Sequence, residues 1–124
     1  MIYNTIYCKI QHLKEKNTIL CQWKQFCKGD DYRNPFKYAM QEIEKHNITT
    51  WITDTTHGFK NEEADTKWLL EVLVPSMINS SITKVVFIIA NDSPLMDEIK
   101  EQEVALKKYF EVNLVESLDA VKKG

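Results

Sequence analysis

The sequence predicts an α/β protein with a single domain over residues 1–124. Three observations support this class: apolar alternation along residues 2–27, helical apolar stripes further on, and the apolar run after Lys84. That run, residues 84–90, is rich in β-branched side chains and is typical of a strand buried on both faces. The predicted element order is ββαβαβαβα, an N-terminal β-hairpin followed by alternating α and β. We expect a mixed sheet with mostly parallel strands, flanked by helices.

The hairpin is predicted from two alternating segments, residues 2–13 and 18–27, separated by a polar break of loop length. On the first segment the apolar side consists of Ile2, Ile6, Cys8 and Ile10. On the second it consists of Ile19, Cys21 and Trp23. We expect the two strands to be antiparallel and to form one edge of the sheet.

Residues 28–33 are predicted as a loop, and Asn34-Pro35 is typical of a helix start. The helix has an apolar stripe at the expected spacing: Phe36, Ala39, Met40 and Ile43. It should end at His46-Asn47. Residues 48–54 are predicted as the next strand, with Trp51 and Ile52 as its apolar pair.

Residues 55–60 are predicted as a loop, and Asn61 as the cap of a second helix. The first turn of that helix holds three carboxylates that suit the helix dipole: Glu62, Glu63 and Asp65. Pro75 removes a backbone donor in mid-helix, so we expect a kink near Val74 before the helix continues to Asn79.

After the strand at residues 84–90, Ser93-Pro94 predicts a third helix with a stripe of Leu95, Ile99 and Leu106. Val112 and Leu114 mark a last strand. A final helical turn, capped by Ser117, is predicted through Leu118, Ala120 and Val121.

Composition excludes several classes of function. The net charge of -2 gives no basic footprint for nucleic acid, and no apolar run is long enough to span a membrane. The N-terminus lacks the pattern of a signal peptide, and the three cysteines have no disulfide spacing, so we expect reduced thiols in a cytoplasmic protein. Neither Cys-x-x-Cys spacing nor a glycine-rich phosphate loop occurs, so we expect no metal and no cofactor.

The element order resembles the STAS domain superfamily, which includes the anti-sigma-factor antagonists, and most closely small stand-alone bacterial STAS-like proteins. The resemblance rests on the hairpin, a strand ending in Asp54, the helix with Trp68-Leu69-Leu70 and Pro75, and the strand at 84–90. It also includes Phe110-Glu-Val-Asn-Leu114, which leads into Ser117-Leu-Asp-Ala120. The resemblance implies a non-enzymatic regulatory module that binds a protein partner.

The resemblance also implies a candidate switch, because the antagonists are phosphorylated on a serine at the start of a helix. Phosphate at a docking surface repels a partner through its added negative charge. The candidate phosphoacceptors here are Thr55 and Thr56, in Asp54-Thr-Thr-His-Gly58, and Thr66, after Asp65. Threonines replace the family's serines, and Lys67-Trp68 stands where a small residue and glycine are expected.

The polar cluster from Asp54 to His57 follows a predicted strand, at the sheet edge where α/β proteins bind ligands. His57 could serve as an acid or base. A solvated loop explains the same residues, with Asp54 and the threonines bonding local backbone groups. Because no nucleophile with its base and orienting group is visible, we expect no enzyme activity.

The first functional hypothesis is therefore protein interaction through the helix at residues 61–79 and the preceding loop. The candidate surface comprises Asp54, His57, Glu62, Glu63 and Asp65. The alternative is a carrier of a small apolar ligand or lipid, held in a pocket between a kinked helix and the sheet, as in the CRAL-TRIO domains that share the general fold. An enzyme using Asp54 and His57 ranks third. A homodimer is compatible with each hypothesis, and the sequence does not identify the partner.

Overall fold

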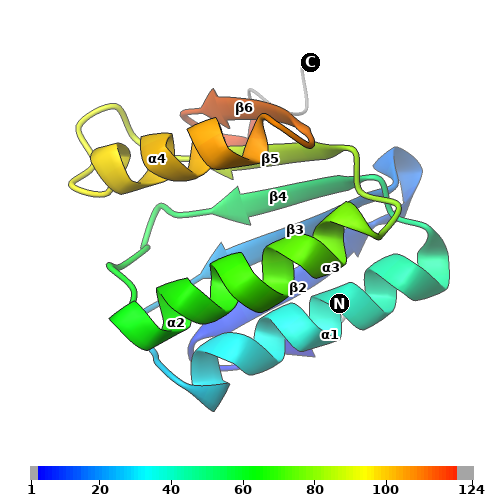
Figure 1. Ribbon diagram of the computed structural model, residues 1–124, viewed down its shortest axis with the longest axis horizontal. Helices are drawn as coiled ribbons and strands as arrows, with labels where there is room; N and C mark the ends of the chain where they lie inside the picture. The colour runs from blue at the N-terminus through cyan, green and yellow to red at the C-terminus, as the bar shows by residue number, and fades with distance from the viewer. Residues whose placement is uncertain (1–2, 120–124) are drawn as a thin grey trace.

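The computed structural model describes residues 3–119 and has one mixed sheet of six strands, which confirms the predicted α/β class. The strands lie side by side in chain order (Figure 1). They are β1 (Tyr3–Asn4), β2 (Cys8–Leu13), β3 (Thr18–Trp23), β4 (Thr50–Asp54), β5 (Lys84–Ile88) and β6 (Glu111–Val115). The pairings β1–β2 and β2–β3 are antiparallel, and β3–β4, β4–β5 and β5–β6 are parallel.

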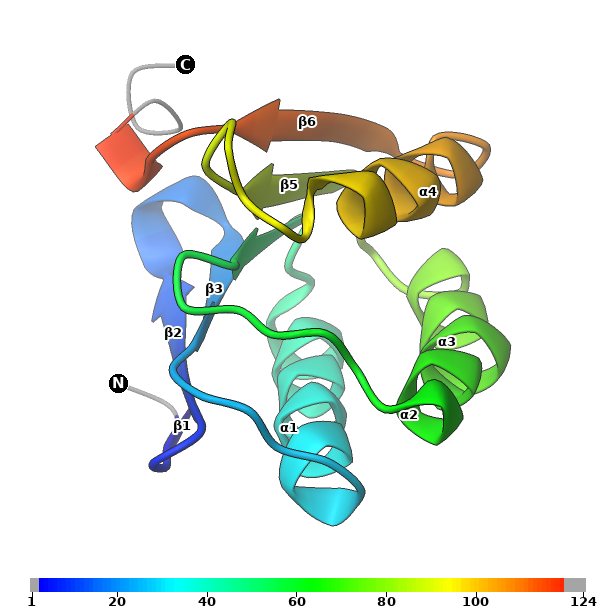
Figure 2. The same ribbon diagram turned by 90° about the vertical axis from the view of Figure 1, so that its left-hand side faces the viewer.

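Each parallel pairing is separated in sequence by a helical segment. Helix α1 (Asp30–His46) joins β3 to β4, and α4 (Met96–Leu106) joins β5 to β6. Between β4 and β5 the segments α2 (Glu63–Trp68), η2 (Leu69–Leu73) and α3 (Val74–Ile78) follow one another without a break; we call them the middle rod. Figure 2 shows α1, the middle rod and α4 on the same side of a curved sheet.

The N-terminal segment differs from the predicted single strand. The Thr5 hydroxyl oxygen accepts hydrogen bonds from the backbone N–H groups of Tyr7 and Cys8, at 3.1 Å each, and this turn separates β1 from β2. β1 therefore folds back on β2, with Tyr3 opposite Ile10. Ile6, predicted on the apolar side, is 66% exposed in the turn. The hairpin itself, formed by β2 and β3 around the short helix η1 (Lys14–Lys16), is as predicted.

The first helix begins earlier than predicted, at Asp30 and not at Pro35. The backbone N–H groups of Tyr32 and Arg33 donate to the carbonyl of Gly29, and Asp30 and Asp31 supply negative charge to the first turn. Pro35 thus lies inside the helix, with its ring buried. The loss of one helical hydrogen bond is tolerated there because the proline packs into the core.

The second helix begins at Glu63, and Asn61 does not cap it. Pro75 is accommodated by a change of helix type: η2 is a π-helical segment that ends two residues before the proline, and α3 then continues to Ile78. A π-helical turn shifts hydrogen bonds to i→i+5 and so can absorb the missing proline donor. The disturbance predicted near Val74 is therefore a π segment within a continuous rod.

The third helix begins at Met96, two residues after Pro94, because the intervening residues form a turn in which the Ser93 hydroxyl accepts from the Leu95 N–H. The final helical turn was predicted through Leu118, Ala120 and Val121, and its last two residues lie outside the described residues.

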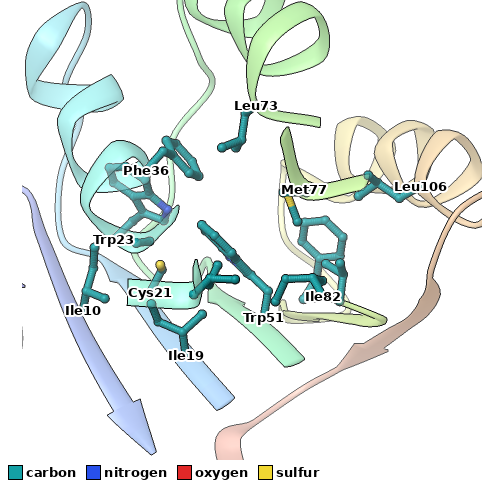
Figure 3. Close-up of a cluster of buried hydrophobic side chains, with 14 of the residues drawn as sticks. Ile10, Ile19, Cys21, Trp23, Phe36, Trp51, Leu73, Met77, Ile82 and Leu106 are labelled. Atoms are coloured by element: carbon teal, nitrogen blue, oxygen red, sulfur yellow. The ribbon is translucent and has the colours of Figure 1, made fainter. Parts of the chain in front are cut away.

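The core has two parts, one on each face of the sheet. The larger part lies under the helices, where Figure 3 shows Trp51 surrounded by side chains of α1 and the middle rod, including Phe36, Leu73 and Met77. The smaller part, on the opposite face, consists of Leu20, Ile52, Val86 and Ile88. All five residues from Val85 to Ile89 are at most 5% exposed, so the predicted burial of this strand on both faces is confirmed.

Candidate functional site

A cavity of about 90 Å³ lies on the helix side of the sheet, between the middle rod and α4. Its walls are mostly apolar. The sheet contributes Trp51, Val85 and Phe87; the middle rod contributes Leu73, Val74 and Met77; and α4 contributes Ile99 and Leu106. An apolar hollow with a few polar groups at the carboxyl ends of parallel strands has the form of a ligand site in α/β proteins.

The wall that α4 and its preceding residue contribute is partly polar. The lining residues have helical spacing: Leu95, Glu98, Ile99, Gln102 and Leu106. Two of these five positions, Glu98 and Gln102, carry polar side chains that are half-buried. They place polar atoms on a wall that is otherwise mostly apolar.

Tyr32 and Asn61 form a polar pair on the cavity wall. The Asn61 side-chain N–H donates to the Tyr32 hydroxyl oxygen at 2.9 Å. Tyr32 is 4% exposed, and burial raises the pKa of its hydroxyl well above the usual value. The hydroxyl is therefore neutral and retains a proton that it can donate. Both side chains come from segments far apart in sequence, α1 and the loop before α2.

Two threonines on β4 and the following loop also line the cavity, and both are engaged in the fold. The Thr53 hydroxyl accepts a hydrogen bond from the indole N–H of Trp51 at 2.8 Å. The Thr55 hydroxyl donates to the carbonyl of Ile88 at 2.6 Å, and the Thr55 N–H donates to the same oxygen. These bonds hold the ring of Trp51 and tie the loop to β5.

An apolar groove continues the cavity outward along the same seam. It is lined on the rod by Leu69, Leu70, Val74, Pro75 and Ile78, and on the α4 side by Gln102, Ala105, Leu106, Lys108 and Tyr109. Leu70 is 49% exposed and Tyr109 is 58% exposed, although both are large and apolar. The groove and the cavity share four lining residues, Leu69, Val74, Gln102 and Leu106, so the two hollows adjoin.

Asp54, predicted as a site residue, lies on the opposite face of the sheet from this cavity. Its carboxylate accepts hydrogen bonds from the N–H and hydroxyl of Thr56, at 2.9 and 2.6 Å, and from the Gln22 side chain at 3.3 Å. Gln22 stands opposite Asp54 across β3 and β4. The carboxylate therefore stabilises the turn after β4, which is the loop interpretation of this cluster.

The remaining residues of the predicted cluster do not converge on one point. Thr55 is buried on the helix side, whereas Thr56 and His57 are exposed. Gly58 is packed closely, because a side-chain carbon there would lie 2.9 Å from the carbonyl oxygen of Thr55. No arrangement of Asp54 and His57 for acid–base catalysis is visible in the described part of the chain.

Asp65 was predicted on an exposed partner surface, and the structure corrects this: it is 2% exposed. Its carboxylate accepts from the Gly29 N–H and from the Arg33 guanidinium, at 3.0 Å each. The Arg33 guanidinium also lies 5.7 Å from the centre of the Trp68 ring. Asp65 thus joins the middle rod to the start of α1. Its neighbours Glu62 and Glu63 are exposed and Thr66 is half-buried.

The cysteines are free and buried, and they do not form a ligand cluster. Burial raises the pKa of the Cys8 thiol to about 12 and that of Cys27 to about 11, so both are protonated near neutral pH. Within residues 3–119 no group of three or more His, Cys, Asp or Glu side chains is placed to hold a metal ion. The same residues include no helix with the length and apolarity needed to cross a bilayer.

Comparison of the chain with models of known protein families, with curated proteins and with solved structures finds no match. The resemblance to STAS domains therefore remains a prediction from element order.

Sequence reasoning missed four of the polar residues that line the cavity: Tyr32, Asn61, Glu98 and Gln102. A signal for two of them was present, because Glu98 and Gln102 follow Leu95 and Ile99 at helical spacing and so had to lie on the inward face. No such signal existed for Tyr32 and Asn61, whose contact depends on how α1 packs beside the loop before α2.

Proposed function

We propose that this protein is a binding module that takes a small, predominantly apolar ligand into the cavity between the middle rod and α4. The observation that supports this proposal is the cavity itself, whose lining residues are mostly apolar with a few polar ones among them. Well-packed interiors leave few voids larger than a water molecule, so a volume of about 90 Å³ that opens into a groove is a feature to explain.

The volume limits the ligand. An apolar cavity of roughly 150 Å³ admits benzene, so the cavity here takes a group of a few carbon atoms. The outer groove extends the apolar surface along the seam, where Leu69 and Val74 line both parts. A short alkyl chain that enters the cavity and continues along the groove fits this shape.

The test uses a neutral apolar probe, 1-hexanol, with binding followed by indole fluorescence and thermal shift. Trp51 lines the cavity and reports its occupancy. We expect dissociation constants of roughly 0.1 to 1 mM for ligands of this size. Val74→Phe, which fills the cavity, should abolish binding. Val72→Phe on the same rod is the matched control, because Val72 is 49% exposed and does not line the cavity.

Binding by Val74→Phe as tight as by the unmodified protein would place the probe elsewhere and contradict the proposal. Absence of any binding to the unmodified protein across a butyl-to-octyl series of alcohols would contradict it as well.

A protein-interaction module is the second candidate, and the exposed apolar groove favours it. Leu70, Ile78 and Tyr109 are 49%, 40% and 58% exposed, and together they form a surface of the kind that docks a partner. This candidate retains the regulatory STAS-like role and the homodimer predicted from sequence as proposals. The carboxylates Glu62 and Glu63, at the start of the rod, are exposed and do not line the groove.

The test of the second candidate compares two charge substitutions. Leu70→Lys introduces a charge into the groove, whereas Val104→Lys introduces one on an exposed position of α4 outside it. A stoichiometric partner, or self-association measured by sedimentation, should be lost with Leu70→Lys and retained with Val104→Lys. Equal behaviour of the two variants would contradict docking at this groove.

A further inference from the structure

The inward face of α4 carries an unusual pair of residues for a helix that covers a sheet. Glu98 and Gln102 are four residues apart and line the cavity on the same face as Ile99 and Leu106. Leucine or isoleucine at both positions would complete the apolar stripe. Polar residues on an inward stripe reduce the stability of the fold, and residues that reduce stability are common in binding sites.

Neither Glu98 nor Gln102 has a hydrogen-bond partner among the described residues. Half-buried polar groups that face an apolar wall lose part of their hydration, and the loss is compensated only when a partner arrives. A ligand that enters the cavity would complete the exclusion of water around both side chains. It must therefore supply the hydrogen bonds that the protein does not.

The polar groups of the cavity define the chemistry of that partner. Among the described residues, Glu98 is the only charged one on the cavity wall, and its carboxylate only accepts hydrogen bonds. The amide N–H of Asn61 already donates to Tyr32, which leaves the Asn61 carbonyl oxygen as a further acceptor. Within residues 3–119 no lysine or arginine lines the cavity itself, and Lys108 lines only the outer groove, so an anionic head group inside the cavity would meet a negative charge.

Glu98 also acts on Tyr32, which lines the same cavity. Burial is the main cause that raises the pKa of the Tyr32 hydroxyl, and the Glu98 carboxylate adds a smaller contribution in the same direction. A positive charge in the cavity would be attracted by the Glu98 carboxylate, and the aromatic side chains of Tyr32 and Phe59 line the same space.

We propose that the ligand of this cavity is a protonated primary amine on a short apolar chain, with its ammonium group at Glu98 and Gln102. The apolar chain fills the space between the rod and the sheet. The ammonium donates to the Glu98 carboxylate and to the side-chain carbonyl oxygens of Gln102 and Asn61. This inference rests on the proposed ligand-binding function and specifies the head group that it selects.

The experiment compares three ligands of equal chain length: hexylammonium, 1-hexanol and hexanoate. Binding is measured by isothermal titration at neutral pH to the unmodified protein, to Glu98→Gln and to Glu101→Gln. Glu101 is the matched control, because it is exposed on the same helix and does not line the cavity. Glu98→Gln retains the size and polarity of the side chain and removes only its charge.

In the unmodified protein we expect hexylammonium to bind about tenfold more tightly than 1-hexanol, and hexanoate to bind most weakly. Glu98→Gln should bring the affinities for the amine and the alcohol to about the same value, whereas Glu101→Gln should keep the advantage of the amine. Equal affinity for the amine and the alcohol, or an advantage that survives Glu98→Gln, would overturn the inference.

The outcomes separate this inference from the proposed function. If 1-hexanol binds and Val74→Phe abolishes its binding, but the amine has no advantage, the cavity function stands and the head-group assignment fails. If the amine binds equally well to Val74→Phe, it binds outside the cavity, and both proposals fail.

Discussion

The two ends of the helical layer are packed very differently. Helix α1 buries five residues against the sheet, among them Ala39 and Ile43, which are both 0% exposed. Helix α4 buries only Ile99 and Leu106. Both helices cover strands of the same sheet, but Ala39 and Ile43 of α1 lie in a filled part of the core, whereas Ile99 and Leu106 of α4 line the cavity. Tyr32 and Phe36 line it too, so the cavity lies where the start of α1, the middle rod and α4 meet.

Stacked aromatic rings form the α1 side of the cavity wall. The ring of Phe36 stacks on Trp51 at 5.8 Å, and the ring of Tyr32 stacks on Trp23 at 5.2 Å. Ala39 has the smallest side chain on the inward stripe and brings the helix backbone close to the sheet. At the other end, Glu98 and Gln102 hold polar atoms where similar rings or branched chains would pack.

The largest expected contrast comes from deleting one isoleucine at each end. Ile43→Ala should reduce the free energy of unfolding by about 4 kcal/mol, because it opens a dry void in a filled core. Ile99→Ala should cost about 2 kcal/mol, because it enlarges a cavity that already opens to the groove and can hydrate. Urea unfolding of the two variants measures the difference. Equal losses would contradict the contrast between the two ends.

The next effect concerns the tie between α1 and the middle rod. Asp65→Ala should reduce the free energy of unfolding by about 2 to 3 kcal/mol, because the Gly29 N–H and the Arg33 guanidinium lose their buried acceptor. Glu63→Ala, exposed on the same turn, is the control and should change stability by less than about 0.5 kcal/mol. A loss with Asp65→Ala no greater than that of the control would show that the ion pair is unimportant to the fold.

Adding methyl groups should lower the free energy of unfolding beneath α1 and raise it at the cavity wall. Ala39→Val should destabilise the protein by about 1 to 2 kcal/mol, because there is no space for two methyl groups beneath α1. Val85→Ile, whose added methyl enters the cavity, should stabilise it by about 0.5 to 1 kcal/mol. Thermal unfolding followed by circular dichroism reports both shifts. A destabilising Val85→Ile would mean that the cavity wall cannot accept the added group.

A similar gain is expected when the polar stripe on α4 is made apolar. Glu98→Leu should raise the free energy of unfolding by about 1 kcal/mol, because it replaces a half-buried carboxylate with a side chain that packs on Ile99 and Leu106. The same variant should lose the preference for an amine. A Glu98→Leu protein less stable than the unmodified one would indicate that the carboxylate supports the fold directly.

The smallest expected effect is the loss of stability at alkaline pH that comes from the buried thiol of Cys27. Burial raises the pKa of Cys27 from 9.0 to about 11, so the folded state holds the proton more tightly than the unfolded chain. Its contribution to stability is present below pH 9 and is lost as the pH rises from about 9 to about 11. Cys27→Ala should reduce this decline in denaturant titrations. An identical decline in both proteins would assign it to other groups.

Much of the sheet and its helices could be predicted from local patterns. Alternation placed Ile19, Cys21 and Trp23 on one face of β3, and the apolar run at β5 predicted burial on both faces. These predictions succeeded because the periods of strands and helices are local properties of the chain. The turn at Thr5 was not predicted, because the apolar alternation continues through the residues around it. The turn is formed by hydrogen bonds to the Thr5 hydroxyl, which alternation does not reveal.

The candidate site was predictable only in part. The sequence pointed to the end of β4, and Thr53 and Thr55 there do line the cavity. Asp54 turned to the other face, because adjacent residues of a strand point in opposite directions and its partner Gln22 lies across the sheet. Asp65 looked like a surface carboxylate at a helix start, but Arg33 and Gly29 enclose it from a distant part of the chain.

The sequence by itself determined the α/β class, the hairpin formed by β2 and β3, and the apolar residues that the helices turn inward, such as Phe36, Ile43, Ile99 and Leu106. Tertiary structure alone decided that the space opposite Glu98 and Gln102 is hollow and that Tyr32 and Asn61 share its wall. The physical reason is the distance along the chain over which each property is decided. Periodicity depends on neighbours a few residues away, whereas a cavity depends on the volumes of side chains that meet only after the sheet has formed.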